Sequence, residues 1–108
     1  MTRSKFFVNQ GILVGFEIAG HTGAGRYGSD VVCAAVSSAA LMAANTITEI
    51  YGLPADIVER GGYLRIELDI ASAKRCQELL RGFCLHLTEL QQQYPNNLRV
   101  TYGGVTND

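Results

Sequence analysis

Residues 5–18, KFFVNQGILVGFEI, set the fold class of this chain. Lys5–Val8 is a short run of strand-forming residues, and Asn9-Gln10-Gly11 is a turn signal. After the turn, apolar side chains alternate with others at Ile12, Val14, Phe16 and Ile18, which is the period of a β-strand. The stretch therefore predicts a β-hairpin with one face on a hydrophobic core.

A similar pattern recurs further along the chain. Ala55–Arg60 and Tyr63–Ile70 are two more predicted strands around Gly61-Gly62, which favours a two-residue hairpin turn. In the second of these strands we expect one set of side chains to face the core and the other to face away: Leu64, Ile66, Leu68 and Ile70 inward, Tyr63, Arg65, Glu67 and Asp69 outward. A last strand is predicted where Leu98, Val100 and Tyr102 alternate.

Each hairpin is followed by a predicted helix. The first runs from Ser29 or Asp30, both good N-cap residues, to about Tyr51, where Gly52 suits the left-handed C′ position. No charged residue occurs from Val31 to Thr48, and a helix that is apolar all round is normally buried all round. One face is expected to pack on the sheet. The other, around Val36, Ala40 and Met42, is left with two uses, a subunit partner or a bound peptide.

The second predicted helix runs from about Ser72 to Tyr94 and stops before Pro95. Its apolar stripe comprises Cys76, Leu79, Leu80, Phe83, Leu87, Leu90 and Tyr94. The element order is thus ββα-ββα-β. It predicts one α+β domain over residues 1–108, a two-layer structure with a mostly antiparallel sheet and two helices.

Composition excludes several classes of protein. The 108 residues suit one domain, and nine Lys+Arg against ten Asp+Glu argue against non-specific nucleic-acid binding. Three cysteines are too few for a disulfide framework, which indicates a reducing, cytoplasmic setting. Residues 1–10 lack the pattern of a signal peptide, and the apolar run 31–47 is interrupted by polar residues, so no membrane span is expected.

The chemistry is concentrated in residues 20–37, GHTGAGRYGSDVVCAAVS. His21 lies on a glycine-rich loop, and Cys33 is expected in the first turn of the helix. A free thiol, with a pKa of about 8.5, becomes a better nucleophile beside an imidazolium or a helix N-terminus. The pattern predicts Cys33 as a nucleophile and His21 as its base, with free N–H groups of the helix start facing a tetrahedral oxyanion.

Other interpretations of these residues stand beside this one. A cysteine among Val and Ala is often a core residue, as we expect for Cys76 and Cys84, and a loop histidine is often a surface residue. Only His21, Cys33 and Asp30 cluster in the sequence, so no metal site is expected. Residues 23–28, GAGRYG, also match G-x-G-x-x-G. The alternative function is therefore a non-catalytic phosphate- or nucleotide-binding module built on loop 20–28, although a hairpin rather than a βαβ unit precedes that loop.

The loop and helix residues also resemble the signature of a known family. They are Gly20-His21, Gly23, Tyr27-Gly28, Asp30, Val32-Cys33-Ala34 and Val36-Ser37. Together they resemble the bacterial ribosomal-processing cysteine protease (Prp) family, including the spacing of twelve from His21 to Cys33. The resemblance extends over nearly the whole chain, with Gly62-Tyr63-Leu64 and Gln93-Tyr94-Pro95 as weaker matches, and residues 24–26 fall in a variable stretch.

The resemblance implies a homodimeric cysteine endopeptidase without a cofactor, and its alternative is a ribosome-associated module on loop 20–28 that binds its target without cleaving it. Members remove an N-terminal extension from large-subunit ribosomal protein twenty-seven, cutting beyond an aromatic-rich stretch. Carried over, Cys33 is the nucleophile and His21 the general base and acid. Gly20, Asp30 and Ser37 match the remaining motif positions. We expect Gly20 to turn the backbone, Asp30 to cap the helix or orient His21, and Ser37 to hydrogen-bond substrate or its own helix.

Overall fold

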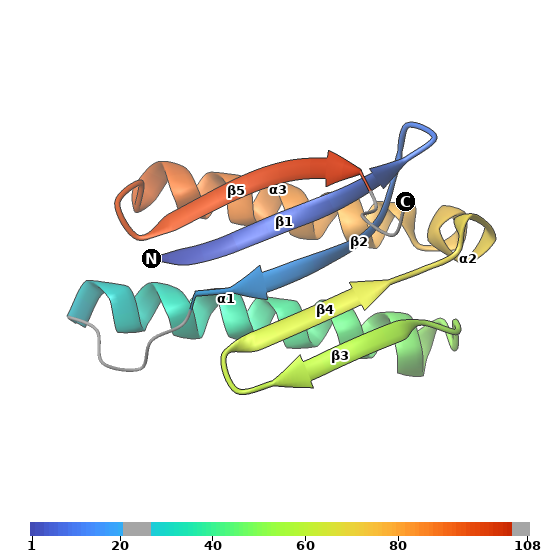
Figure 1. Ribbon diagram of the computed structural model, residues 1–108, viewed down its shortest axis with the longest axis horizontal. Helices are drawn as coiled ribbons and strands as arrows, with labels where there is room; N and C mark the ends of the chain where they lie inside the picture. The colour runs from blue at the N-terminus through green and yellow to red at the C-terminus, as the bar shows by residue number, and fades with distance from the viewer. Residues whose placement is uncertain (21–26, 105–108) are drawn as a thin grey trace.

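The computed structural model describes residues 1–20 and 27–104 of the chain. The elements, in chain order, are β1 (Thr2–Asn9), β2 (Ile12–Ala19), α1 (Tyr27–Asn45), the π-helical turn η1 (Thr46–Ile50), β3 (Asp56–Arg60), β4 (Tyr63–Glu67), α2 (Ile70–Arg75), α3 (Gln77–Gln93) and β5 (Leu98–Gly104). This order confirms the predicted α+β class, and the two long helices lie on the same side of the sheet (Figure 1).

The five strands form one sheet in the order β3-β4-β2-β1-β5. The pairs β1–β2 and β3–β4 are antiparallel, as the hairpin signals predict. The pair β2–β4 is also antiparallel, whereas β5 lies parallel to β1. Gln10 and Gly11 connect β1 to β2 with φ values of 53° and 79°. Two successive residues with this left-handed backbone conformation are typical of a two-residue hairpin loop. Thus both hairpins form where the sequence predicted them.

The first helix begins earlier than predicted. Helix α1 starts at Tyr27, so Ser29 and Asp30 lie inside its first turn and neither is the N-cap. Cys33 is consequently the seventh residue of the helix, in the second turn instead of the first. The predicted end is confirmed, because Gly52 follows the π-helical turn with φ +67°.

The second predicted helix is divided in two. The strand prediction to Ile70 and the helix prediction from Ser72 are both wrong, since the Asp69 side chain accepts a 2.7 Å hydrogen bond from the Ser72 N–H and starts α2 at Ile70. The helix then breaks at buried Cys76. Helix α3 opens with Gln77, whose side-chain amide accepts from Leu13 N–H at 2.9 Å and donates to Leu13 C=O at 2.7 Å. The start of α3 is thus hydrogen-bonded to β2 next to the register shift between Phe7 and Val8 of β1.

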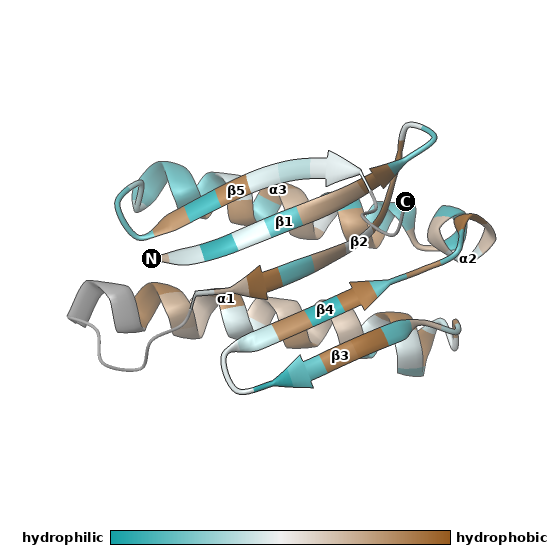
Figure 2. Cartoon of the chain, viewed as in Figure 1, coloured by the Kyte–Doolittle hydropathy of each residue, from teal (hydrophilic) through white to brown (hydrophobic). Residues whose placement is uncertain are grey.

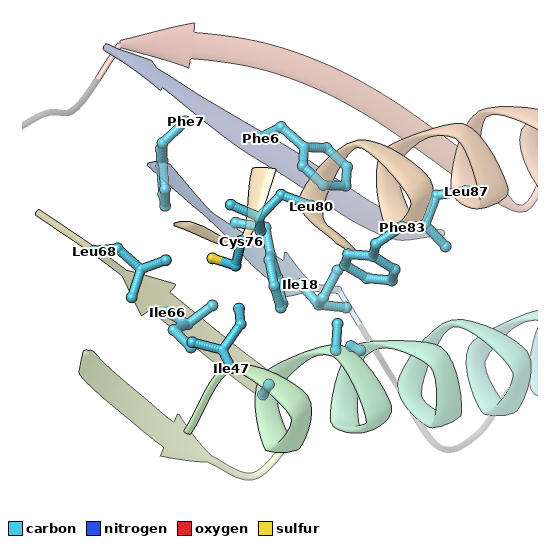
Figure 3. Packing of buried hydrophobic residues seen from close by; sticks show 14 of the residues in the cluster. Phe6, Phe7, Ile18, Ile47, Ile66, Leu68, Cys76, Leu80, Phe83 and Leu87 are labelled. Atoms are coloured by element: carbon cyan, nitrogen blue, oxygen red, sulfur yellow. The ribbon is translucent and has the colours of Figure 1, made fainter. Parts of the chain in front are cut away.

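The core fills the space between the sheet and helices α1 and α3. Figure 3 shows Phe6, Ile18, Ile66, Ile47 and Phe83 in this layer. The Phe16 and Phe83 rings meet edge to face with centroids 4.7 Å apart. Cys76, Leu80, Phe83 and Leu87 of the predicted stripe are all buried. Helices α1 and α3 cover this one face of the sheet, which explains why apolar residues alternate with others along the strands.

The opposite face of the sheet is covered by its own charged side chains. Figure 2 shows hydrophilic and hydrophobic residues alternating along the strands. Arg65 lies with its guanidinium 4.9 Å from the Phe7 ring centroid and pairs with Glu67 at 2.7 Å. Tyr63 donates a 3.0 Å hydrogen bond to Glu17. The predicted outward direction of Tyr63, Arg65 and Glu67 is thus confirmed.

The stretch Val31–Ile50 is long and apolar enough to cross a membrane, and 39% of its most apolar window is buried. The core helix of a soluble protein meets the same criterion, so this is weak evidence for a span. Val32, Val36, Ala40, Ala43 and Ile47 are buried against the sheet, whereas Leu41, Met42 and Ile50 are exposed. The helix is therefore amphipathic by burial although it carries no charge over Val31–Thr48.

Candidate active site

Cys33 lies on the buried side of α1, at the edge of a cavity. Cys33 is 7% exposed to solvent, and the cavity has a volume of about 160 Å³. The lining residues come from α1, from the β3–β4 hairpin and from the first two strands: Cys33, Ser37, Ala40, Leu41, Glu59, Arg60, Gly62, Tyr63, Leu64, Thr2 and Ile18. The fold therefore brings the predicted nucleophile to a hollow between a helix and a hairpin that are far apart in sequence.

The other two cysteines are placed differently. Cys76 is fully buried, its Sγ donates to the Ser72 carbonyl at 3.6 Å, and burial raises the pKa of the Cys76 thiol. Cys84 is half-buried and its Sγ donates to the Tyr102 hydroxyl at 3.4 Å. Neither lines the Cys33 cavity. Of the three thiols, Cys33 is thus the one that lines the cavity between α1 and the β3–β4 hairpin.

Ser37 accompanies Cys33 along the helix. It lies one turn further on, lines the same cavity, and its Oγ is 4.0 Å from the Cys33 Sγ. Thr2 and Tyr63 are the other hydroxyl-bearing residues in the lining, and most of the remaining wall is apolar. The spacing of four thus sets a hydroxyl beside the thiol, as the motif predicted for these two positions.

Gly20 ends β2 in a conformation that other residues rarely adopt. Its φ is +89°, and a Cβ at this position would overlap the Met1 carbonyl oxygen. The sharp turn expected at Gly20 is therefore present. Ile18, two residues before Gly20, lines the Cys33 cavity, so β2 ends beside this cavity.

His21 lies outside the described residues, as does the part of the glycine-rich loop at residues 21–26. The predicted contact between His21 and Cys33, and the predicted lid, therefore stay predictions. Asp30 belongs to the first turn of α1, so its expected capping role is wrong as far as the helix boundary is concerned. The free N–H groups of the helix start were expected to face the reacting carbonyl. The structure does not favour this arrangement, because Cys33 lies six residues beyond Tyr27 and about 9 Å along the helix axis.

The apolar surface expected around Val36, Ala40 and Met42 is divided among three environments. Val36 is in the core, Ala40 lines the Cys33 cavity, and Met42 lines a second cavity between α1 and α3. That second cavity contains His86 and no cysteine. Within residues 1–20 and 27–104, no group of three or more His, Cys, Asp or Glu side chains converges as a metal site would require.

The β3–β4 hairpin is the part of the site that the sequence analysis missed. It supplies Glu59, Arg60, Gly62, Tyr63 and Leu64 to the cavity wall. The sequence contained the hairpin signal at Gly61-Gly62, but it contained no sign that this hairpin meets α1. That contact depends on β4 pairing with β2, which places the turn of the hairpin next to the middle of α1 (Figure 1).

The antiparallel neighbours of β2 argue against the dinucleotide-binding interpretation of residues 23–28. A dinucleotide fingerprint requires a βαβ unit whose two strands are hydrogen-bonded neighbours in a parallel sheet, whereas β4 lies between β2 and β3, the strands before and after α1, and pairs with both in antiparallel fashion. The fingerprint also needs an acidic residue at the end of the second strand, about 20 positions on. Glu49, the acidic residue at that spacing, lies within η1 and not at a strand end. The G-x-G-x-x-G match therefore lacks the structural context that would give it meaning.

Comparison with known proteins identifies the class. A family model described as "Cysteine protease Prp" matches residues 1–99. The protein is thus a small α+β cysteine protease, in agreement with a cavity-lining thiol on its central helix. Ribosomal processing cysteine protease Prp of Bacillus subtilis is 35% identical over 99 residues, which cover 86% of this chain and 88% of that protein. The chain belongs to the Prp family.

Solved structures agree with this assignment. Prp from S. aureus in complex with a substrate peptide matches with a TM-score of 0.85 and 25% identity, over 94% of this chain and 99% of the other. Prp from S. aureus in complex with a covalently linked product peptide matches with a TM-score of 0.81 and 27% identity over the same shares. The resemblance stated from the loop and helix residues is therefore confirmed at the level of family and fold.

Proposed function

We propose that this protein is a ribosomal-processing endopeptidase with a Cys33–His21 dyad, which removes the N-terminal extension of large-subunit ribosomal protein twenty-seven. The observation that carries the proposal is that Cys33 is the cysteine that lines the cavity beneath the β3–β4 hairpin. The relatives are named for ribosomal processing, and the S. aureus protein has been crystallised with a substrate peptide. These names support the substrate class.

The chemistry proceeds in two steps. The Cys33 thiolate attacks the scissile carbonyl carbon, and the C–N bond breaks as His21 protonates the leaving amine. Water, deprotonated by His21, then attacks the thioester and releases the acid, returning the thiol. A covalently linked product peptide in the S. aureus relative supports a covalent intermediate for this chain.

The supporting residues take roles that their positions favour. Gly20 turns the chain immediately before His21, and Ile18 of the same strand lines the cavity that contains Cys33. Ser37 donates its hydroxyl hydrogen to the substrate backbone beside the thiol. Asp30, inside the first turn of α1, orients His21 and does not cap the helix. The enzyme acts as a single domain over residues 1–108, in the cytoplasm, as a homodimer and without nucleic acid.

The test is cleavage of the purified, extended ribosomal protein. Wild-type protein is expected to release the extension, whereas Cys33→Ser and His21→Ala are expected to release none. Cys84→Ser is the matched control, because Cys84 lies outside the cavity. Cleavage that persists in Cys33→Ser disproves the dyad, and an intact substrate with the wild-type enzyme disproves the substrate.

A further inference from the structure

Glu59 brings a carboxylate to the wall of the Cys33 cavity. In the sheet register Ile18 pairs with Leu64, and Leu64 pairs with Glu59, so these residues form one row across β2, β4 and β3. Side chains in one such row share a face of the sheet. Ile18 is a buried residue of the core layer beneath α1 and α3, and all three residues line the cavity. Glu59 therefore lies on the α1 side, at the sheet edge.

The neighbouring positive charges belong to the other face. Arg60 pairs with Tyr63 in the register, and its guanidinium carbon lies 5.1 Å from the Tyr63 ring centroid. The Tyr63 hydroxyl donates to Glu17, which is on the face away from the helices together with Arg65. Arg60 thus borders the cavity, but its charge is stacked on the opposite face.

The Glu59 carboxylate is available to a ligand. Strand β3 is exposed along its whole length, and within the described part of the chain Glu59 makes no hydrogen bond or ion pair. The cavity wall next to it is apolar at Ile18, Leu41 and Leu64. A single carboxylate on an apolar wall favours a long side chain with a positive end, because the methylene groups pack while the charge pairs.

We infer that Glu59 is a specificity-determining residue, which binds a lysine or arginine side chain of the peptide substrate close to the scissile bond. This inference rests on the proposed function, since it places the peptide in the Cys33 cavity. An exposed pair of opposite charges changes binding by up to about fivefold, and salt weakens the effect.

A first experiment measures the electrostatic potential around the Cys33 thiol without using peptidase activity. In a Cys84→Ser background, Cys33 is labelled with a cationic trimethylammonium-ethyl and an anionic sulfonato-ethyl methanethiosulfonate, and mass spectrometry identifies the labelled thiol. The ratio of cationic to anionic rate is expected to fall roughly threefold to tenfold in Glu59→Gln and further in Glu59→Lys. Asp56→Asn is the matched control, because Asp56 lies on the same strand but pairs with Glu67 on the opposite face.

A second experiment measures specificity. Peptides spanning the processing site carry lysine, norleucine or glutamate at successive positions on both sides of the cleaved bond. For wild-type enzyme, kcat/KM is expected to be highest with lysine at one of these positions, and the lysine-to-norleucine ratio is expected to approach one in Glu59→Gln. In Glu59→Lys the preference is expected to shift to glutamate, with Asp56→Lys keeping the wild-type order.

The outcomes separate this inference from the proposed function. Cleavage of all peptides with no preference for lysine, or a labelling ratio equal in wild type and Glu59→Gln, overturns the role of Glu59 and leaves the dyad intact. Absence of any cleavage by the wild-type enzyme overturns the proposed function and, with it, the substrate role of Glu59. A lysine preference that Glu59→Gln removes and Asp56→Asn retains establishes the inference.

Discussion

The Cys33 thiol and the Ser37 hydroxyl lie one helical turn apart on α1, with Sγ and Oγ 4.0 Å from each other at the edge of the same cavity. This distance is at the outer limit for a hydrogen bond that involves sulfur, so the contact between the two groups is weak. A peptide that enters the cavity therefore meets the thiol and the hydroxyl together. Apart from Cys33 itself, Ser37 is the described motif residue whose removal should affect catalysis with little effect on folding.

Ser37→Ala is expected to lower kcat/KM for the processing peptide by roughly fivefold to tenfold, because it removes one hydrogen bond to the substrate. The free energy of unfolding should change by less than about 0.5 kcal/mol, since Ser37 is exposed. Steady-state kinetics and urea unfolding measure the two effects. Ser38→Ala, at the next exposed position, is the control, and equal kinetic losses in both variants would contradict the role of Ser37.

Gly20→Ala is expected to destabilise the protein by about 1 to 3 kcal/mol, because a left-handed backbone is strained for alanine. The added methyl group also overlaps the Met1 carbonyl, so the end of β2 must shift. Urea unfolding measures the loss, and processing activity should fall with it. Gly61→Ala should behave like wild type, since Gly61 has open space around its Cα. Equal stability of the two variants would show that the turn at Gly20 is not constrained.

Asp69→Ala is expected to lower Tm at neutral pH because α2 loses its N-terminal cap. The Ser72 N–H donated to Asp69 lowers the pKa of the Asp69 carboxyl below its usual value. The charged form is thus favoured in the folded state, and this stability is present above the usual carboxyl range and lost as the pH falls through the lowered pKa. The Tm difference from wild type should therefore shrink in acid. A difference that is constant with pH would contradict this assignment, and Asp69→Asn tests whether a neutral cap suffices.

Cys76 is expected to resist alkylation in the folded protein at pH 9, where an exposed thiol reacts readily. Burial raises the pKa of the Cys76 thiol above its ordinary value near 9.0, so the folded state holds the proton more tightly than the unfolded state. Stability should consequently decline as the pH rises above 9, and Cys76→Ala should show a shallower decline. Urea unfolding from pH 8 to pH 10 measures it. Equal slopes in both proteins would refute the contribution of Cys76.

The predicted helices differ from the observed ones where a local signal had two meanings. Ser29 and Asp30 are good cap residues, yet α1 continues through them to Tyr27. Asp69 is also a good cap residue, and it starts α2 where the alternating pattern continued the strand to Ile70. The break at Cys76 had no sequence signal, because it arises from the contact between Gln77 and the β1–β2 ladder.

By itself, the sequence determined the order of strands and helices apart from the break between α2 and α3, the family signature and the motif that contains Cys33 and Ser37. Periodicity and turn chemistry act over a few neighbouring residues, so they are legible without coordinates. Only the tertiary structure decided that β5 lies parallel to β1, that β4 pairs with β2, and that Glu59 thereby reaches the Cys33 cavity. Those contacts depend on which strands bury their apolar faces together, and residues distant in the chain make that choice jointly.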